Sequence, residues 1–339
     1  MKPVQCWNTS GLYNAIQTRD MVRIGIIGLS VHSEAYTSII NSANGPGDLE
    51  GCKVVALYEP PVSQDVRFSP QQIEKFSETI RKHGVKIVDS MESLLKTSDA
   101  VMVLSNDGRP HLRETLPALK RKIPVYIDKP LADNFEGVQA IFKASKDWNV
   151  PVFSCSPLRF GEDFQTGIRT GKFGSILGGE TYGPAPLQEA HVDLFWDGIH
   201  GVELLYTIMG SGCQTVQQLK SGDEDVVIGT WRDGRIGIFR GIRKGKTGFG
   251  GRAFGTAGVA HMERFGGYKP LVVEIVKFFK TGISPVEDEE TIEIYAFMEA
   301  ARRSQMMGGG KFDIHEVLDT CCEACEPTDD EQETIKNKH

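Results

Sequence analysis

The sequence predicts an α/β N-terminal half built on a doubly wound parallel sheet, followed by an α+β half with a mainly antiparallel sheet. Three observations lead to this prediction. Apolar runs alternate with amphipathic stretches over residues 21–155, as strands alternate with helices around a parallel sheet. Beyond that point, short strand-like runs follow one another with glycine turns between them, which is typical of an antiparallel sheet. At 339 residues the chain is also longer than a typical single domain.

We divide the chain into four segments. Residues 1–20 are polar and aperiodic, and are expected to form an N-terminal tail. The parallel-sheet domain is expected over residues 21–155 and the α+β domain over residues 156–315. Residues 316–339 are acidic and then lysine-rich, which predicts a second, solvated tail.

The expected elements of the first domain follow from hydrophobic periodicity. Strands are expected at residues 22–27, 52–58, 85–88, 100–105, 125–127 and 151–155. Helices are expected between them, at about residues 34–40, 69–83, 91–96, 111–120 and 134–148.

The second domain is expected to contain helices at its beginning and end and strands between them. The helices are expected at residues 159–169, 198–209, 268–280 and 288–306. The strands are expected at residues 176–182, 215–219, 225–231, 236–243 and 253–261. The basic, glycine-rich segment 240–252 is expected to be an exposed hairpin tip, which either approaches an anionic ligand or a neighbouring subunit or is a solvated turn.

Composition and charge exclude several kinds of partner. The net charge of −7 gives no general attraction to nucleic acid or to an anionic membrane. No window approaches the ~20 apolar residues of a membrane span, and residues 1–20 lack the apolar core of a secretory signal, so we expect a cytoplasmic protein. The seven cysteines are irregularly spaced, and Cys322 and Cys325 lack the further ligands of a zinc site. Neither a disulfide framework nor a metal is expected.

The first strand is followed by a tight turn and a helix, in the order that opens a dinucleotide-binding βαβ unit. Gly28 would allow the tight turn, and Glu59 at the end of the second strand would accept hydrogen bonds from a ribose diol. Ser30 and Ser33 stand where the GxGxxG pattern has its second and third glycines, so the Ser30 hydroxyl could donate to a pyrophosphate instead. His32 lies in the same turn, and we assign it to the cofactor site. A plain strand-to-helix turn is the alternative.

The expected strand at 125–127 ends in an acid, a base and a proline: Asp128, Lys129 and Pro130. In an open parallel sheet, ligands bind beyond the carboxyl ends of the strands, so Lys129 is expected where substrate and cofactor meet. An amine there can donate to a substrate oxygen or exchange a proton with it. The alternative is an exposed lysine that happens to follow a strand.

Together these features resemble the glucose-fructose oxidoreductase, inositol dehydrogenase and rhizopine-catabolism family (Gfo/Idh/MocA). The resemblance is carried by the dinucleotide-type turn, the DKP tripeptide, the apolar GIHGVELL segment at 198–205 and the antiparallel second half. It spans residues 21 to about 315. The resemblance implies a Rossmann-type first domain, a second domain for substrate binding and oligomerisation, and NAD or NADP as cofactor.

In this family the turn and the acid after the second strand bind the dinucleotide, and the lysine of the E/D-K-P motif contacts the reacting hydroxyl. The carboxylate of Glu59 favours NAD over NADP because it would repel a 2′-phosphate. By resemblance, Asn106 and His111 would border the nicotinamide and its ribose. The residues assigned to the cofactor are Gly28, Ser30, His32, Glu59, Asn106, His111, Asp128, Lys129 and Pro130.

The other catalytic pattern of the family is an aspartate four residues before a histidine. His200 matches the histidine, whereas Trp196 occupies the place of the aspartate. Asp197, three residues before His200, could share a helix face with it or could cap the helix. Lys129, His200 and Asp197 are assigned as catalytic, since an imidazole exchanges protons near neutral pH. The residues assigned to the substrate, either as aromatic and acidic groups suited to a polyol or by resemblance, are Arg159, Tyr182, Asp193 and Trp196.

The resulting hypothesis is an NAD(P)-dependent dehydrogenase acting on CH–OH groups of a sugar, inositol or related polyhydroxylated substrate. Two alternatives stay open: an enzyme of the same family that uses NAD in glycoside cleavage, and a dinucleotide-binding sensor without turnover. The serines in the turn and Trp196 support the sensor. We also expect a homo-oligomer, either a dimer or a tetramer, because the open face of an antiparallel sheet commonly needs covering.

Overall fold

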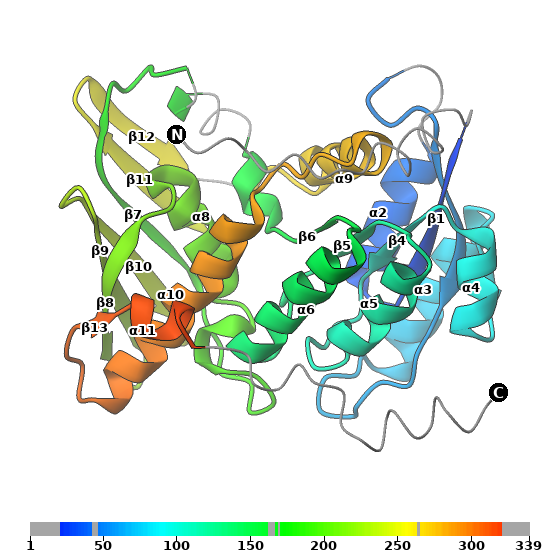
Figure 1. Cartoon of the computed structure of the whole chain (residues 1–339), viewed down its shortest axis with the longest axis horizontal. Coiled ribbons are helices and arrows are strands. Elements are labelled where there is room, and N and C mark those ends of the chain that lie inside the picture. Colours follow the sequence, from blue (N-terminus) through cyan, green and yellow to red (C-terminus); the bar gives the residue numbers. More distant parts are fainter. Residues whose placement is uncertain (1–20, 43–46, 162–166, 169, 263–264, 321–339) are drawn as a thin grey trace.

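The computed structural model describes residues 21–42, 47–161, 167–168, 170–262 and 265–320 (Figure 1). The predicted tail at 1–20, most of the predicted tail at 316–339, and the cysteines Cys321, Cys322 and Cys325 lie outside these ranges. Two sheets lie side by side, one in each half of the chain (Figure 1). The predicted fold class is confirmed. Among the described residues, no helix is both long enough and apolar enough to cross a bilayer.

The first sheet is parallel throughout, and its strand order is β3-β2-β1-β4-β5-β6. The strands are β1 (Val22–Ile27), β2 (Cys52–Tyr58), β3 (Lys86–Val88), β4 (Ala100–Val103), β5 (Val125–Ile127) and β6 (Val152–Phe153). The central strands are almost wholly buried, as expected for a sheet covered on both faces. The order reverses between β1 and β4, and doubly wound sheets bind ligands in the crevice beyond the carboxyl ends of such strands.

Polar caps fix where most helices of this domain begin. The side chains of Ser30, Ser69, Ser90 and Asn134 accept hydrogen bonds from the backbone of the first helical turn. The helices are α2 (Val31–Asn41), α3 (Pro70–Lys82), α4 (Met91–Thr97), α5 (His111–Lys120) and α6 (Phe135–Trp148). Helix α5 is the exception, because it follows Pro110 and has no side-chain cap.

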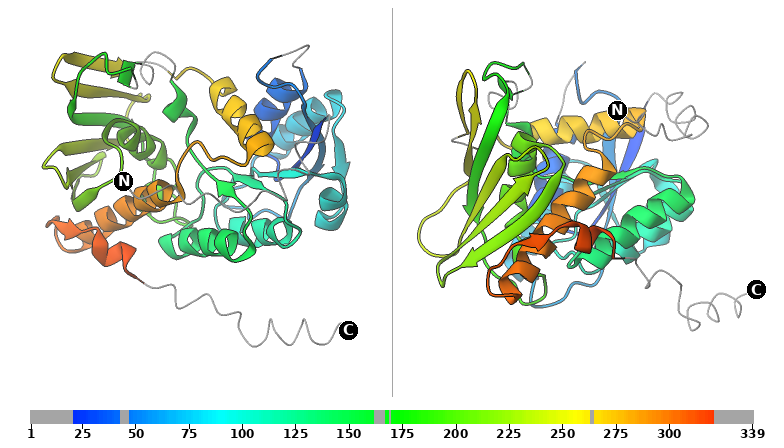
Figure 2. Two further views of the ribbon diagram at one scale, coloured as in Figure 1. Left: turned by 45° about the horizontal axis from the view of Figure 1, so that its top comes forward. Right: turned by 60° about the vertical axis from the view of Figure 1, so that its left-hand side comes forward.

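The second sheet has the order β12-β11-β7-β10-β9-β8-β13 and is antiparallel except between β7 and β10. Its strands are β7 (Ile176–Pro184), β8 (Cys213–Lys220), β9 (Glu224–Trp231), β10 (Ile236–Ile242), β11 (Gly250–Gly255), β12 (Gly258–Met262) and β13 (Phe312–Asp313). Helices α8 (Ile199–Met209) and α10 (Asp288–Met306) pack on the face that looks toward the first domain (Figure 2). In the described part of the chain, no helix covers the opposite face (Figure 2).

Some elements of the second half differ from the prediction. The run 253–261, expected as one strand, is a hairpin of β11 and β12 that turns at Thr256 and Ala257. The basic segment 240–252 is not a hairpin tip, because β10 and β11 lie on either side of β7 rather than beside each other. Of the helix expected at 159–169, the structure describes the 3₁₀ turn η1 (Pro157–Phe160) and two helical residues at 167–168, while 162–166 and 169 lie outside the described residues. The short helix α11 (His315–Leu318) enters the segment predicted as a tail.

Helix α9 (Lys269–Thr281) comes from the second half of the chain but packs on the first sheet. Its Leu271, Ile275 and Phe278 are fully buried in the apolar cluster of β1, α2 and β6. The ring of Phe278 meets that of Phe153 at a centroid distance of 4.8 Å. The chain therefore returns to the first domain before it forms α10.

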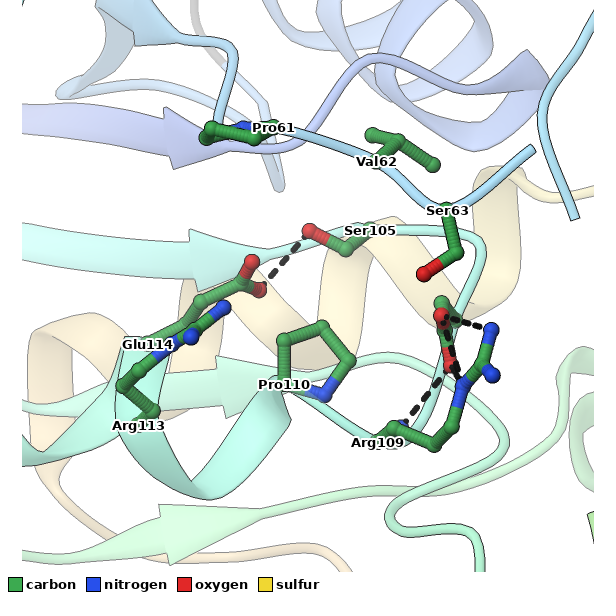
Figure 3. A pocket seen from close by; sticks show the side chains of 9 residues that line it. Pro61, Val62, Ser63, Ser105, Arg109, Pro110, Arg113 and Glu114 are labelled. Carbon is green, nitrogen blue, oxygen red and sulfur yellow. Dashed lines mark hydrogen bonds and ion pairs between the residues drawn. The ribbon is translucent and has the colours of Figure 1, made fainter. Parts of the chain in front are cut away.

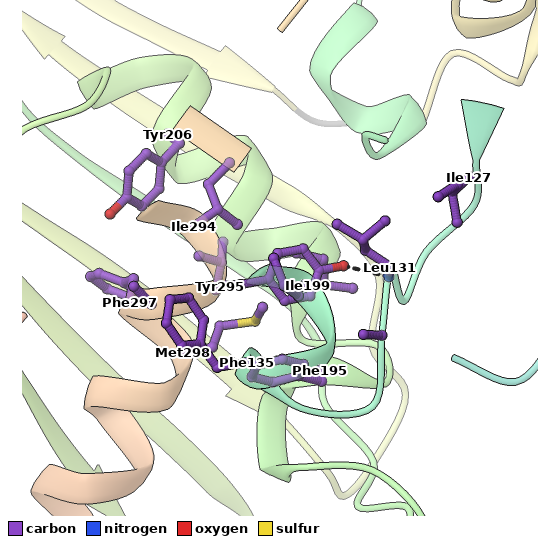
Figure 4. Packing of buried hydrophobic residues seen from close by; sticks show 14 of the residues in the cluster. Ile127, Leu131, Phe135, Phe195, Ile199, Tyr206, Ile294, Tyr295, Phe297 and Met298 are labelled. Atoms are coloured by element: carbon purple, nitrogen blue, oxygen red, sulfur yellow. Dashed lines mark hydrogen bonds between the residues drawn. The ribbon is translucent and has the colours of Figure 1, made fainter. Parts of the chain in front are cut away.

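A second apolar cluster joins the two sheets into one body (Figure 4). It contains Ile127 and Leu131 from the first half and Phe195 and Tyr295 from the second. The Tyr295 hydroxyl accepts a hydrogen bond of 2.7 Å from the backbone N–H of Leu131. Because these contacts flank residues 128–130, the carboxyl end of β5 is held against the second half of the chain.

Candidate active site

One glycine and two serines shape the turn after β1. Gly28 has a φ of +93°, and a Cβ there would lie 2.4 Å from the backbone nitrogen of Ser105, so the position requires glycine. Ser30 caps α2, and Ser33 Oγ donates a hydrogen bond of 2.8 Å to the Gly28 carbonyl. Both hydroxyls are buried within the turn. The serines thus hold the turn together, and the helix terminus behind them favours an anion.

Two adjoining hollows lie at the carboxyl ends of β2 and β4. One, of about 470 Å³, is bordered by Glu59 and Arg67. The other, of about 350 Å³, is bordered by Ser105 and Glu114 (Figure 3). The loop at 61–62 lines both hollows. A glycine cradle beside a hollow with an acid at its edge fits the nucleotide part of a dinucleotide, although neither hollow is lined by Lys129 or His200.

Asn106 and His111 hold loops together. Asn106 Nδ2 donates to the Val66 carbonyl at 3.1 Å. His111 is fully buried, with Nε2 3.1 Å from the Ser105 carbonyl oxygen and Nδ1 3.3 Å from that of Leu131. Both side chains are engaged with backbone groups, so the structure gives them a part in positioning the loops after β4 and β5.

Asp128 and His32 form a buried hydrogen-bonded pair next to Lys129. Asp128 Oδ2 contacts His32 Nδ1, which joins the carboxyl end of β5 to the first turn of α2. Burial alone would raise the pKa of Asp128, but His32 and Lys129 outweigh it and hold that pKa below its ordinary value. Asp128 therefore stays ionised, and the His32 ring is fixed against Tyr36 and Tyr268.

Lys129 reaches across to the second half of the chain. Its Nζ forms an ion pair with Asp197 Oδ1 at 2.8 Å and lies 5.7 Å from the centre of the Trp196 ring. Asp197 lies just before α8, so this contact connects β5 to the helix that carries His200. The structure brings Lys129, Asp197 and Trp196 together.

His200 lies in the first turn of α8, where its Nδ1 is 2.7 Å from Ser156 Oγ and its ring packs edge-on against Phe249. Burial holds the pKa of His200 well below its ordinary value, and the nearby charges of Lys129 and His32 lower it further. At neutral pH the imidazole is uncharged, which makes it a hydrogen-bond partner and a weak proton acceptor.

Three residues assigned to the substrate have other surroundings. Arg159 is buried, with Nε 2.9 Å from Glu203 Oε2. Asp193 forms an ion pair with Lys220, in which Oδ1 lies 3.0 Å from Nζ. Tyr182 is 40% exposed, and its register places it on the face of the second sheet opposite α8. Arg159 and Asp193 are thus committed to ion pairs within the protein, and Tyr182 faces away from the helix that carries the histidine.

Sequence reasoning missed some polar contacts around the site. The Gly108 N–H donates to His191 Nε2 at 3.1 Å, and the same nitrogen lies 3.5 Å from Asp107 Oδ1. Burial lowers the pKa of His191, so the ring is neutral and accepts this hydrogen bond. Ser156 was also missed, although its position just after β6 is a signal, because strand ends of this sheet share one edge.

A glycine turn, an acid after β2 and a lysine that meets a second domain are features of a dinucleotide-binding oxidoreductase. The family model described as "Oxidoreductase family, NAD-binding Rossmann fold" matches residues 22–154. Residues 22–154 thus match the family, Gfo/Idh/MocA, that the resemblance predicted.

Solved structures share the fold of both halves. The scyllo-inositol dehydrogenase of Lactobacillus casei, solved with NAD(H) and scyllo-inositol, has a TM-score of 0.68 at 14% identity, covering 87% of this chain and 99% of that chain. The myo-inositol 2-dehydrogenase of Lactobacillus plantarum has a TM-score of 0.70 at 18% identity, covering 86% of this chain and 99% of that chain. A search among curated proteins found no match.

Proposed function

We propose that the protein is a dehydrogenase that transfers a hydride between NAD and a CH–OH group of a sugar, an inositol or a related polyhydroxylated compound. The bound nicotinamide would supply the hydride acceptor. The observation that carries the proposal is the 2.8 Å ion pair between Lys129 Nζ and Asp197 Oδ1, which sets a charged donor between the two halves of the chain. The inositol dehydrogenases that share the fold support the substrate class.

In this proposal Lys129 binds the reacting oxygen. An ammonium group donates hydrogen bonds and stabilises negative charge as the hydroxyl proton leaves. Asp197, already 2.8 Å from the amine, can accept a hydrogen bond from a neighbouring hydroxyl of a polyol. His200 completes the proton-handling pair as a neutral imidazole held by Ser156. The hydrogen bond between Asp128 and His32 fixes the backbone that presents Lys129.

We propose NAD as the cofactor, because Glu59 would repel a 2′-phosphate. Arg67 lines the same hollow and is the side chain that would attract such a phosphate. The affinities for NAD and NADP should therefore be compared directly. Calorimetry is expected to show tighter binding of NAD than of NADP, and Glu59→Gln is expected to narrow the difference. Tighter binding of NADP by the wild type would contradict this assignment.

The test of the main proposal is a turnover assay over a panel of inositols and sugars, with NADH formation as the readout. Lys129→Met is expected to lower kcat/KM by about 100- to 10,000-fold, since it removes the charged donor. The control is Lys143→Met, which changes a lysine of α6 that is about half exposed and pairs with Asp147. Unchanged turnover in Lys129→Met, on a substrate that the wild type oxidises, would reject the assigned role.

A sensor that binds the dinucleotide without turnover is the second candidate. The lowered pKa of His200 favours it, because a weak base is a poor proton acceptor. Binding of NAD without turnover across the whole panel would support the sensor, whereas failure to bind either NAD or NADP would exclude both candidates. Nucleotide retained through purification, with no net NADH formed, would instead favour glycoside cleavage.

We further propose a cytoplasmic homo-oligomer, formed through the face of the second sheet opposite α8. The register of the strands places five exposed apolar side chains on this face: Tyr182, Leu219, Ile236, Phe254 and Val259. Exposed apolar patches of this kind mark protein interfaces. Light scattering is expected to show a dimer or tetramer, and Ile236→Lys is expected to yield monomer. Leu187→Lys, at an exposed residue outside the sheet, is the control, and a monomeric wild type would contradict the proposal.

A further inference from the structure

A buried serine joins the end of the first sheet to the first turn of α8. Ser156 follows β6, has no exposed surface, and places its Oγ 2.7 Å from His200 Nδ1. The His200 backbone N–H bonds to the Asp197 carbonyl oxygen at 3.2 Å, so the histidine lies one turn beyond the carboxylate that pairs with Lys129. The serine therefore holds a ring that belongs to the candidate active site.

The Ser156 hydroxyl has one way to satisfy its hydrogen-bonding groups. A hydroxyl carries one donor and two acceptor sites. The Leu158 N–H fills one acceptor site at 3.2 Å, and the other contact that Oγ makes with the described residues is His200 Nδ1. If Nδ1 carried the proton, Oγ would accept twice, and its own O–H, sealed from water, would have no acceptor. The O–H therefore donates to Nδ1.

This hydrogen bond fixes the proton of the neutral imidazole on Nε2. The other tautomer would leave a buried donor unpaired, which disfavours it by about 5- to 150-fold. Burial also lowers the pKa of His200, so the ring is uncharged at neutral pH. A charged ring would carry a proton on Nδ1 as well and would displace the serine proton from this contact. The neutral ring thus presents an N–H donor at Nε2.

Nε2 remains available to a ligand. No described residue bonds to it, yet it is not sealed from solvent, as Nδ1 of His191 is. We infer that His200 donates a hydrogen bond from Nε2 to an oxygen of the substrate, and that Ser156 is the positioning residue that keeps the proton on this nitrogen. The inference rests on the proposed function, and it narrows the role of His200 from proton acceptor to hydrogen-bond donor.

This role suits an imidazole that is a weak base. A neutral N–H stabilises the negative charge that develops on a reacting oxygen, and it does so without giving up its proton. His200 would act in this way beside the ammonium group of Lys129. The lowered pKa of His200 opposes proton transfer to the ring, but it does not oppose hydrogen-bond donation from the ring.

The first test is ¹⁵N NMR of the histidine side chains in the full-length protein near neutral pH. Long-range ¹H–¹⁵N correlations distinguish a protonated ring nitrogen from an unprotonated one, and the spectrum of His200→Gln identifies the signals of His200. We expect a protonated Nε2 and an unprotonated Nδ1. A proton on Nδ1, or on both nitrogens, would overturn the inference. Absence of turnover across the polyol panel would overturn the proposed function without changing this spectrum.

Ser156→Ala tests the role of the serine. Loss of the hydroxyl is expected to shift the Nδ1 signal of His200 and to populate both tautomers. Ser145→Ala is the matched control, because Ser145 is equally buried and its hydroxyl donates to the Val150 carbonyl oxygen at 2.7 Å. This control should leave the His200 signals unchanged. An unchanged Nδ1 signal in Ser156→Ala would overturn the role of Ser156, and if that variant fails to fold, the wild-type spectrum still decides the tautomer.

The two roles of His200 also predict different kinetics. Glutamine carries an N–H₂ donor at its tip but does not take up a proton, whereas leucine has neither property. On a substrate that the wild type oxidises, His200→Gln is expected to keep a kcat at least about 10-fold above that of His200→Leu, because a donor to the developing charge is retained. Equal losses of kcat in the two variants would overturn the donor role.

Discussion

Replacement of Glu203 by leucine tests whether Arg159 serves stability rather than substrate binding. Arg159 is 8% exposed and Glu203 is 2% exposed, and the two are joined by a contact of 2.9 Å. A second contact of 2.7 Å runs from Arg159 to Glu290, whose side chain is 21% exposed. Glu203→Leu leaves the buried Arg159 guanidinium with only the partly exposed Glu290 as a partner, so it is expected to lower the free energy of unfolding by up to about 3–5 kcal/mol.

The double variant Arg159→Met/Glu203→Leu is expected to recover most of this loss. Burial raises the pKa of Glu203 even though Arg159 faces it, which shows that the pair does not fully offset the cost of desolvation. With both charges gone, Glu290 can be hydrated because it is partly exposed. The free energy of unfolding of the double variant should therefore lie within about 2 kcal/mol of the wild-type value. The interaction energy between the two sites in the double-mutant cycle should be about 1–3 kcal/mol.

Urea unfolding followed by circular dichroism measures these values, with the slope of the transition checked for two-state behaviour. The control is Glu78→Leu at the exposed pair with Lys82, where no measurable change is expected. The reasoning would be refuted if Glu203→Leu cost less than about 1 kcal/mol, or if the losses of the two single variants simply added. If Arg159→Met instead kept the wild-type free energy of unfolding but had a raised KM, Arg159 would be assigned to the substrate site.

Three further changes test the local structure. Gly28→Ala puts a Cβ 2.4 Å from the Ser105 backbone nitrogen, on a residue whose own φ is +93°. The urea midpoint and the affinity for NAD should both fall, and unchanged values would contradict the assigned turn. Ser33→Ala removes the bonds to Gly28 and Ser30 and should cost about 1 kcal/mol of unfolding free energy, and a neutral effect would mean that the Ser33 hydroxyl does not stabilise the turn. Burial raises the pKa of Asp288 to about 7, so the folded state holds this proton more tightly, and the stability it contributes at low pH is lost as the pH rises through 7. Asp288→Asn should therefore match the wild type near about pH 4 and be more stable by about 1–3 kcal/mol near about pH 8, and a pH-independent difference would refute this.

The fold of the first half could be predicted because its signals are local. Runs such as the one at Val22–Ile27 are apolar except at Arg23 and are followed by capped amphipathic stretches. This alternation of strands and helices is typical of a parallel sheet with right-handed crossovers. The hairpin of β11 and β12 was missed because Thr256 and Ala257 at its turn carry no strong turn signal. The periodicity of α9 shows that one face is buried, but it does not show that this face packs against Phe153 in the other half.

Some residues of the candidate site could likewise be predicted from the sequence, whereas their partners could not. Gly28, Glu59 and Lys129 could be placed from the rule that ligands bind at the carboxyl edge of a parallel sheet. Their partners could not, because the contacts are long-range: Lys129 meets a residue 68 positions away in Asp197. The charge of Glu114, on α5, suggests an ordinary surface residue in the sequence, whereas the fold buries it to 3% exposure.

The hydrogen bond from Leu131 to Tyr295, with the apolar side chains around it, has a consequence for how ligands enter. Swinging the two halves apart would bring those side chains into water, at a cost that grows with the apolar area exposed. Wide hinge opening is therefore disfavoured, so the two halves are expected to keep their arrangement while a ligand enters the hollows that Pro61 and Val62 line.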